Sequence, residues 1–205
     1  MSTRADKFFT APDGCVFVFG AATPQALPPP HLPEFAFIGR SNAGKSSLLN
    51  ALTGQAKLAH VSATPGRTQQ LNFFRLGGRC YLVDVPGYGY AKAAKSKVAG
   101  WQGTLKHYLR SRTVLKRIFV LIDARHGILA ADEAMLTDLD RAAQSYQIVF
   151  TKADAIAPSQ YEALLADTRQ KLITHTAAFP EQLITSSVSK LGITALRTII
   201  CDCLG

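Results

Sequence analysis

One short segment constrains the fold of this chain more than any other feature of the sequence. Residues 39–46 read GRSNAGKS and match the pattern G-x-x-x-x-G-K-[ST] of a phosphate-binding loop, or P-loop. The segment lies directly after the strand-like run EFAFI and directly before the helix-like run KSSLLNAL. Glycine lets backbone N–H groups curl around phosphates, and a helix N-terminus adds positive potential. The segment therefore predicts a strand, a loop and a helix that together bind a nucleoside triphosphate.

The rest of the chain alternates β-rich runs with helical stretches. We expect strands at residues 35–38, 71–75, 80–84, 117–122, 147–150 and 182–185, and helices at 45–52, 98–111, 130–144, 159–173 and 193–203. Residues 71–85 look like a hairpin with Gly77 and Gly78 at its turn. Such an alternation predicts a three-layer α/β fold, with a mostly parallel six-stranded sheet that has one antiparallel strand.

Length and composition indicate one domain. Residues 1–33 are loosely patterned and end in LPPPHLP, so we expect an N-terminal extension, either part of the same domain or flexible, followed by a single domain at 34–205. No run of 18 or more apolar residues exists, which argues against a membrane span. The four cysteines are scattered, as suits a cytoplasmic protein with reduced thiols. Cys201 and Cys203 form a C-x-C that is either a metal-binding pair or two side chains of the last helix.

The net charge of +9 is unevenly distributed. Residues 35–122 contain 14 Lys or Arg and one acidic residue, Asp84, whereas the rest of the chain contains 9 basic and 13 acidic residues. A local charge of +13 favours a polyanionic partner, most simply RNA. A solvated basic face without a partner is the alternative, and a triphosphate site itself accounts for some of the cations.

Two motifs supply groups for phosphates and metal. In the P-loop, Lys45 is expected to reach the β- and γ-phosphates, and the Ser46 hydroxyl to bind Mg²⁺. Residues 84–87 read DVPG and match D-x-x-G at the end of a strand. Asp84 is placed to hold Mg²⁺ through water, and the Gly87 N–H to meet the γ-phosphate. In the polar segment 62–70, Thr68 is the candidate for a second Mg²⁺-binding hydroxyl and Thr64 is the alternative.

The base is predicted by residues 151–154, which read TKAD and follow the strand QIVF. The motif resembles the [NT]-K-x-D guanine signature. An aspartate carboxylate can accept hydrogen bonds from both N1–H and the 2-amino group of guanine, whereas adenine has neither donor there. Asp154 is therefore expected to select guanine, with the Lys152 stem lying across the base. Residues 186–188 resemble the loop that reaches the guanine O6 through a backbone N–H.

The finer text of these motifs resembles one family of bacterial GTPases. The segments GRSNAGKSSLLNAL, TPGRTQ, DVPGYGYAK, TKAD and SSVSKLGI are similar to the EngB family, also called YihA or YsxC, from about Pro33 to the end of the chain. This resemblance implies a single Ras-like P-loop GTPase domain that binds GTP or GDP with Mg²⁺. It also implies association with the large ribosomal subunit during its assembly, and a link to cell division and septation. The +13 region at 35–122 fits a ribosomal RNA partner, and we expect a monomer without membrane contact.

The motifs and the resemblance together define a set of candidate site residues. The proposed catalytic residues are Lys45, Thr68 and Gly87, and the proposed metal ligands are Ser46, Thr68 and Asp84. The candidate nucleotide-binding residues are Gly39, Arg40, Ser41, Asn42, Ala43, Gly44, Lys45, Ser46, Ser47, Gly66, Arg67, Thr68, Asp84, Val85, Pro86, Gly87, Thr151, Lys152, Ala153, Asp154, Ser186, Ser187 and Val188.

One position bears on the rate of hydrolysis. Many GTPases have a glutamine after D-x-x-G that orients the attacking water, and this chain has Tyr88 there. We therefore expect slow intrinsic hydrolysis. In related GTPases an asparagine at the position of Asn42 binds a K⁺ ion, so K⁺ stimulation is one hypothesis; the alternative is that Asn42 only braces the P-loop by hydrogen bonds. A P-loop kinase or ATPase, and an RNA-binding scaffold with structural GTP, are the competing functions.

Overall fold

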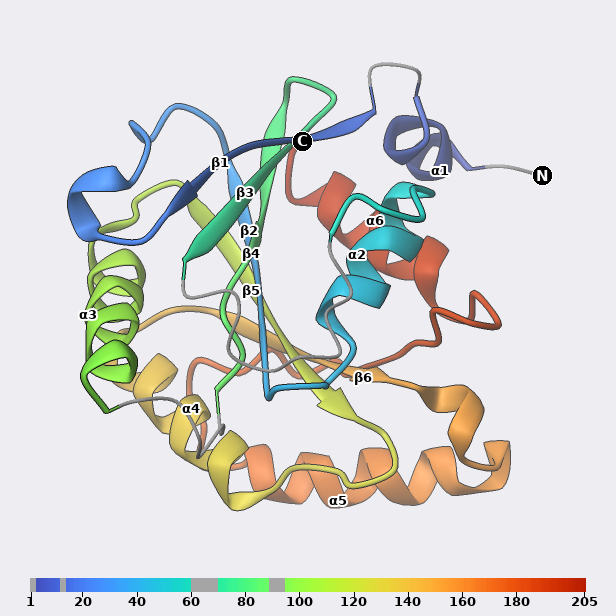
Figure 1. Cartoon of the computed structure of the whole chain (residues 1–205). Coiled ribbons are helices and arrows are strands. Elements are labelled where there is room, and N and C mark those ends of the chain that lie inside the picture. Colours follow the sequence, from blue (N-terminus) through green and yellow to red (C-terminus); the bar gives the residue numbers. More distant parts are fainter. Residues whose placement is uncertain (1–2, 12–13, 60–69, 89–94) are drawn as a thin grey trace.

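The computed structural model describes residues 3–11, 14–59, 70–88 and 95–205. One mixed sheet with the strand order β1-β3-β4-β2-β5-β6-β7 forms its centre (Figure 1). The strands are β1 (Cys15–Ala21), β2 (Glu34–Gly39), β3 (Leu71–Leu76), β4 (Cys80–Asp84), β5 (Leu115–Asp123), β6 (Tyr146–Thr151) and β7 (Leu183–Ile184). Strands β2 and β6 are buried along their whole length, as expected for strands covered on both faces.

The sheet is mostly parallel, with one strand reversed. Strands β4, β2, β5, β6 and β7 run parallel to one another, and β3 is antiparallel to both of its neighbours, β1 and β4. The hairpin between β3 and β4 turns at Gly77 and Gly78, whose φ angles of 51° and 65° lie in the left-handed region that favours glycine. The prediction of a mostly parallel sheet with a glycine hairpin and one antiparallel strand is confirmed.

The prediction of six strands is wrong, because β1 adds a seventh at the edge of the sheet. It pairs with β3 from Cys15 opposite Leu76 to Ala21 opposite Leu71, with an irregularity between Phe17 and Phe19. In a regular strand, Phe17 and Phe19 would face the same side of the sheet. The extra residue between them breaks this alternation, so that Phe17 contacts Phe74 on one face and Phe19 contacts Phe73 on the other. No alternating pattern remained from which a strand could be predicted.

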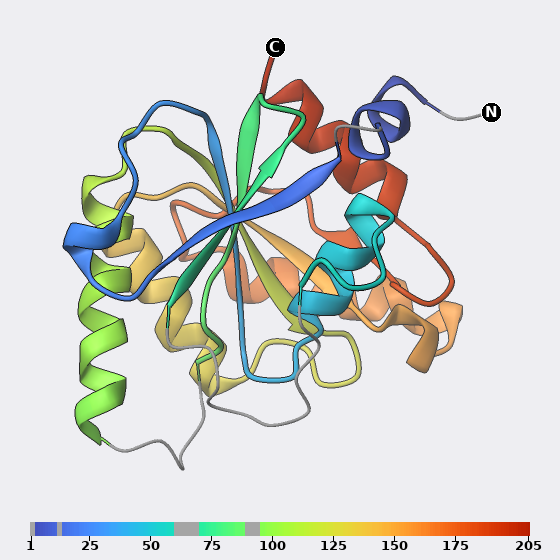
Figure 2. The same cartoon turned by 45° about the horizontal axis from the view of Figure 1, so that its top comes forward.

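Helices cover both faces of the sheet and complete the three layers (Figure 2). On one face, α3 (Lys95–Ser111), α4 (Ala130–Arg141) and α5 (Tyr161–Leu172) pack on a cluster that contains Ile38, Val120 and Ile148. On the other face, α1 (Arg4–Phe9), α2 (Lys45–Thr53) and α6 (Ile193–Asp202) pack on a cluster that contains Phe37, Phe119 and Val149. Short 3-10 turns occur at Pro24–Ala26, Ala153–Ala155 and Pro158–Gln160. No helix of the described residues is long and apolar enough to cross a membrane.

Helix α1 is a second element that the sequence did not predict. Thr3 and Asp6 form a reciprocal capping box at its N-terminus, which stabilises a helix of only six residues. Asp6 also accepts hydrogen bonds from Arg197 at 2.8 Å and from Thr194 at 3.0 Å, both on α6. These contacts attach α1 to the last helix of the chain.

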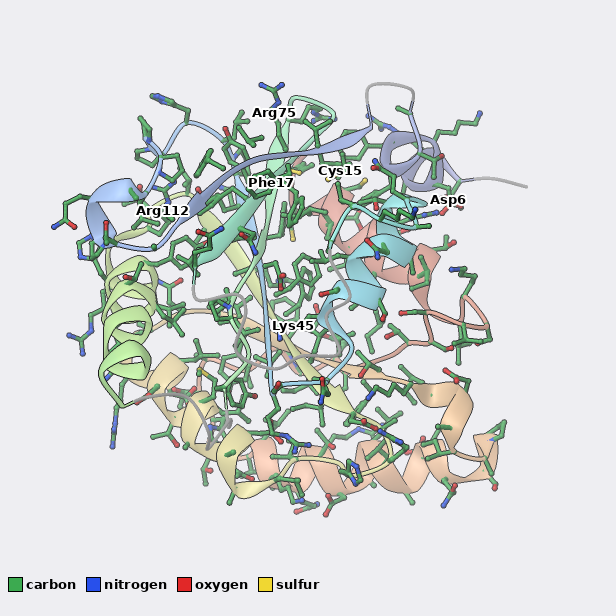
Figure 3. All side chains as sticks on the ribbon, viewed as in Figure 1. Asp6, Cys15, Phe17, Lys45, Arg75 and Arg112 are labelled. Atoms are coloured by element: carbon green, nitrogen blue, oxygen red, sulfur yellow. The ribbon has the colours of Figure 1, made fainter. Side chains whose placement is uncertain are left out.

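A buried ion pair and its hydrogen bond to residue 28 attach the segment 27–33, which precedes β2, to the end of α3. Arg112 (labelled in Figure 3) directly follows α3. It donates to both carboxylate oxygens of Glu34 and to the Pro28 carbonyl. The Glu34 and Arg112 side chains are 0% and 5% exposed. Arg112 therefore serves the fold and lies outside any surface that a partner could reach.

Candidate functional site

The carboxyl ends of four parallel strands meet at one edge of the sheet. Strand β2 leads into the P-loop, β4 ends at Asp84, β5 ends at Asp123 and β6 ends at Thr151. Because ligands of open α/β sheets bind at this edge, the topology brings together the motifs that the sequence separates by more than a hundred residues.

The P-loop has the backbone conformation that its sequence predicts. Gly44 has φ 88° and caps the N-terminus of α2, and Asn42 has φ 65°. Gly39 is required for a different reason. A Cβ there would lie 2.8 Å from the Leu121 carbonyl oxygen on β5, so any side chain would push the loop off the sheet.

Lys45 and Asp84 face each other in a poorly solvated region. Lys45 Nζ donates to the Gly39 carbonyl at 3.4 Å. Burial lowers the pKa of this lysine, which the nearby Asp84 partly opposes, and burial raises the pKa of Asp84 to about 6, which Lys45 partly opposes. Asp84 Oδ1 is buried and has no hydrogen-bond partner among the described residues. A buried, unpaired carboxylate oxygen is costly and suits a site completed by a cation.

Gly87 lies against the P-loop backbone. A Cβ at this position would be 3.0 Å from both Cα and N of Ser41, and 3.2 Å from Lys45 Nζ. The next residue, Tyr88, forms an isolated parallel bridge with Arg40. The D-x-x-G motif therefore lies beside the lysine of the P-loop.

The TKAD motif is bonded to the P-loop. Thr151 Oγ1 donates to the Ala43 carbonyl at 2.6 Å, and Lys152 Nζ donates to the Asn42 carbonyl at 2.7 Å. Lys152 has φ 57° and is also 2.9 Å from Asp123 Oδ2. These contacts make residues 151–152 and the P-loop one rigid unit.

Asp154 is held by the loop after β7. The Ser186 hydroxyl donates to Asp154 Oδ1 and accepts the N–H groups of Val188 at 3.1 Å and Ser189 at 3.0 Å. The Ser186 N–H donates to the Leu191 carbonyl at 3.0 Å. Of residues 186–188, only Ser187 keeps an N–H without a partner in the described chain, which makes it the donor best placed for an added acceptor.

Within the described part of the chain, no hydrogen bond of the Asn42 side chain braces the P-loop. Asn42 is exposed, and its side-chain amide makes no hydrogen bond within the described part of the chain. Bracing comes instead from its backbone carbonyl through Lys152. K⁺ binding by Asn42 stays a prediction.

Some predicted site residues lie outside the described residues. These are Gly66, Arg67 and Thr68, with the alternative Thr64. Lys92, one of the basic residues of 35–122, also lies outside them. The backbone at Lys95 and Lys97 forms the first turn of α3.

Sequence reasoning missed two buried aspartates at this edge. Asp123 accepts from Arg125 at 2.6 Å and from Lys152 at 2.9 Å. Asp132, at the start of α4, lies 3.2 Å from Arg40 Nε. The position of Asp123 directly after the strand RIFVLI could have revealed it, because carboxyl ends of parallel strands line such sites.

The basic residues of 35–122 divide into two groups. Arg112 is buried in its ion pair, and Arg117 lies over the Phe179 ring at 3.6 Å and donates to Gln147. The exposed ones among the described residues are Lys57, Arg75, Arg79, Lys106, Arg110 and Lys116. The surface excess of charge is therefore smaller than the +13 that the sequence suggests.

The terminal C-x-C belongs to the packing of α6. Cys201 and Cys203 are partly buried against the apolar cluster under α2 and α6. Across the described ranges, no three His, Cys, Asp or Glu side chains come together as a metal site.

Comparison with known proteins identifies the family. A model of the 50S ribosome-binding GTPase family matches residues 34–152. The chain is 54% identical to a probable GTP-binding protein EngB of Cereibacter sphaeroides, over 91% of this chain and 86% of that protein. It is 50% identical to the EngB protein of Ruegeria pomeroyi, over 95% and 88%.

Solved structures share the fold at low sequence identity. A probable GTP-binding protein EngB superposes with a TM-score of 0.65 and 18% identity, over 83% of this chain and 98% of that one. Era from Aquifex aeolicus superposes with a TM-score of 0.68 and 22% identity, over 85% and 57%. The chain therefore belongs to the EngB family of GTP-binding proteins, which are P-loop GTPases of the 50S ribosome-binding class.

Proposed function

We propose that this protein binds GTP with Mg²⁺ at the edge formed by the P-loop, D-x-x-G, TKAD and residues 186–188, hydrolyses it to GDP and phosphate, and acts as a switch in assembly of the large ribosomal subunit. The observation that carries the proposal is the bonding of TKAD to the P-loop through Thr151 and Lys152. Because the base motif and the phosphate loop form one unit, a guanine nucleotide can engage both without rearrangement of the site.

The residues around Asp84 fit a magnesium ion. Asp84 supplies a buried carboxylate oxygen without a partner, and the Ser46 hydroxyl makes no hydrogen bond within the described chain. Hard oxygen ligands of this kind suit Mg²⁺, and we assign Ser46, Asp84 and Thr68 to it. The ion would neutralise charge on the phosphates. A solved structure of Era, which shares this fold, holds MgGDPNP.

The chain's own groups would bind and orient the phosphates. Lys45 is partly buried, and because desolvation destabilises its ammonium, a bound anion would be favoured there. The Gly87 N–H is assigned to the γ-phosphate, and Asn42 to a K⁺ ion that speeds hydrolysis. Measuring phosphate release in K⁺ and in Na⁺ tests this assignment: an equal rate in both would remove K⁺ from the mechanism.

Base selection rests on Asp154. The Ser186 hydroxyl fixes the Asp154 carboxylate through Oδ1, and the remaining lone pairs are left to accept N1–H and the 2-amino group of guanine. The Ser187 N–H is assigned to O6. Competition binding with GTP, ATP and XTP tests the proposal. GTP should bind far more tightly than ATP, and Asp154→Asn should shift preference from guanine to xanthine. Equal binding of ATP and GTP by the native chain would contradict the function and favour a P-loop kinase or ATPase.

The partner is proposed to be ribosomal RNA, contacted through exposed basic residues of 35–122. Lys106 and Arg110 are exposed on α3 and Lys116 is exposed on β5, whereas Lys92, Lys95 and Lys97 come earlier in the sequence. Each phosphate contact contributes a log–log salt slope of roughly −0.7 to −0.9. Replacing either set of three by alanine should therefore flatten the slope of subunit binding by about two to three units.

The experiment needs a control and a nucleotide comparison. Arg141 and Arg169 are exposed arginines outside the basic region, and their alanine variants should leave the slope unchanged. Binding is measured with GDP and with a non-hydrolysable GTP analogue across a salt series. An unchanged slope in both triple variants would identify the basic residues as a solvated face. Phosphate release that is absent even with ribosomal subunits would favour the scaffold with structural GTP.

A further inference from the structure

The side chain of Tyr88 belongs to a buried network that joins three segments. Its hydroxyl donates to Asp132 Oδ1 at 2.8 Å, while Arg40 Nε lies 3.2 Å from Asp132 Oδ2. Asp132 is fully buried and also accepts the Leu129 N–H at 3.0 Å, at the start of α4. One carboxylate thus connects the P-loop, the residue after D-x-x-G and the N-terminus of α4.

The backbone of Tyr88 forms a second connection to the P-loop. Its N–H donates to the Gly39 carbonyl at 3.3 Å, and its carbonyl accepts the Ser41 N–H at 3.0 Å. Gly87 lies between these bonds and Asp84, where a Cβ would be in tight contact with the Ser41 backbone at 3.0 Å. The position of the Gly87 N–H therefore depends on how firmly Tyr88 is anchored.

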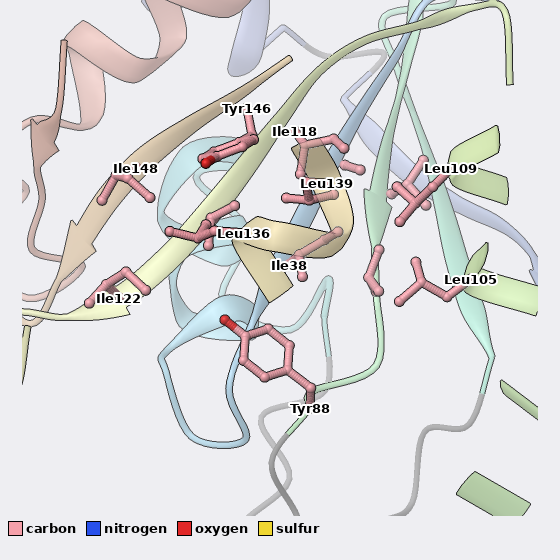
Figure 4. Close-up of a cluster of buried hydrophobic side chains, with 14 of the residues drawn as sticks. Ile38, Tyr88, Leu105, Leu109, Ile118, Ile122, Leu136, Leu139, Tyr146 and Ile148 are labelled. Atoms are coloured by element: carbon pink, nitrogen blue, oxygen red, sulfur yellow. The ribbon is translucent and has the colours of Figure 1, made fainter. Parts of the chain in front are cut away.

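The tyrosine faces the core and not the phosphate side of the loop. Only 7% of Tyr88 is exposed, and it belongs to the apolar cluster that contains Ile38, Leu136 and Leu139 (Figure 4). Burial and the neighbouring Asp132 raise the pKa of its phenol, so that the hydroxyl stays protonated and donates to the carboxylate. A hydroxyl bonded to a buried carboxylate is not available to orient a water molecule.

We propose that Tyr88 is a positioning residue of the nucleotide switch: through Asp132 and Arg40 it clamps Gly87 against the P-loop, and it takes no part in orienting the attacking water. The proposal rests on the proposed function, because the place of Gly87 matters only if its N–H meets a γ-phosphate. Loosening the clamp should weaken GTP binding and spare GDP, which has no γ-phosphate.

Tyr88→Phe tests the clamp, since it keeps the ring in the core and removes only the hydrogen bond. The control is Tyr146→Phe, the same deletion at a fully buried tyrosine of the same cluster (Figure 4). In the full chain with Mg²⁺, affinity for a non-hydrolysable GTP analogue should fall about tenfold relative to GDP, as for loss of a hydrogen bond to a charged group. The rate at saturating GTP should stay within about twofold of wild type, and the control should change neither quantity.

Two results would overturn the clamp. A large fall in the saturating rate with unchanged affinities would show that Tyr88 acts on the water, and no change in either would reduce it to packing. Asp132→Asn provides an independent arm. Because it removes the charge that pairs with Arg40 and accepts from Tyr88, it should shift the GTP-to-GDP ratio in the same direction. Combining it with Tyr88→Phe should give less than the product of the two effects, because both variants disrupt the same network. Failure of the wild type to prefer GTP over ATP would instead reject the proposed function, whatever the variants do.

Discussion

Replacing Arg112 with alanine should destabilise this protein strongly, although the residue lies outside the nucleotide site. Arg112 Nε is 3.0 Å from both carboxylate oxygens of Glu34, and its two terminal nitrogens are each 2.6 Å from an acceptor, Glu34 Oε1 and the Pro28 carbonyl. The substitution removes all of these donors and leaves the fully buried carboxylate of Glu34 without its counter-ion.

The magnitude follows from the burial of the pair. Breaking a buried ion pair from one side costs about 3–5 kcal/mol in the free energy of unfolding, because the remaining charge stays desolvated. For a chain of this size each kcal/mol lowers Tm by about 2–4 °C, so a decrease of about 6–20 °C is expected. Replacing both partners by apolar residues of similar volume, as in Glu34→Leu with Arg112→Met, should recover most of the loss.

Urea unfolding followed by circular dichroism measures the effect as a shift in the midpoint at constant slope. Arg110→Ala is the matched control, since Arg110 is exposed on the same helix, and it should change the free energy of unfolding by less than about 0.5 kcal/mol. If Arg112→Ala lost no more stability than Arg110→Ala, the reasoning from burial and unpaired charge would be refuted.

Two further predictions concern the titration of buried or paired groups. Hydrogen bonds from Arg197, and to a smaller extent from the Thr3 N–H, hold the pKa of Asp6 well below its ordinary value of 3.8. The stability that Asp6 contributes is therefore fully present above pH 3.8 and is lost as the pH falls below it. Thermal melts across the acidic range should show a flatter pH dependence for Asp6→Asn than for wild type, and identical curves would contradict this. Burial raises the pKa of the Cys15 and Cys80 thiols to about 12. Neither thiol should therefore react with a thiol reagent in the native protein at mildly alkaline pH, and both should react after denaturation. Modification of either thiol at the rate of an exposed one would show that the core opens there.

Local sequence was enough to predict the elements that carry the candidate site. The runs before residues 39, 84 and 151 are continuous and apolar because their strands are covered on both faces, and each is followed by a polar motif. A pattern of this kind depends on neighbours in the chain, so the strand ends and the motif order could be predicted together. The edge strand β1 could not, because its pairing with β3 connects residues far apart and its bulge removes the alternation.

What the sequence by itself determined is the kind of site: a P-loop, a carboxylate for a metal and a guanine motif, each set by residue type and short-range spacing. Only the tertiary structure decided which of these groups are free to act. Asn42 and Arg112 illustrate the difference, since the amide of one has no partner within the described chain and the charge of the other is buried against Glu34. Tyr88 does so most clearly, because its hydroxyl meets a carboxylate 44 positions away. Long-range partners of this kind leave no local pattern, because the contact depends on how the helices pack on the sheet and not on spacing along the chain.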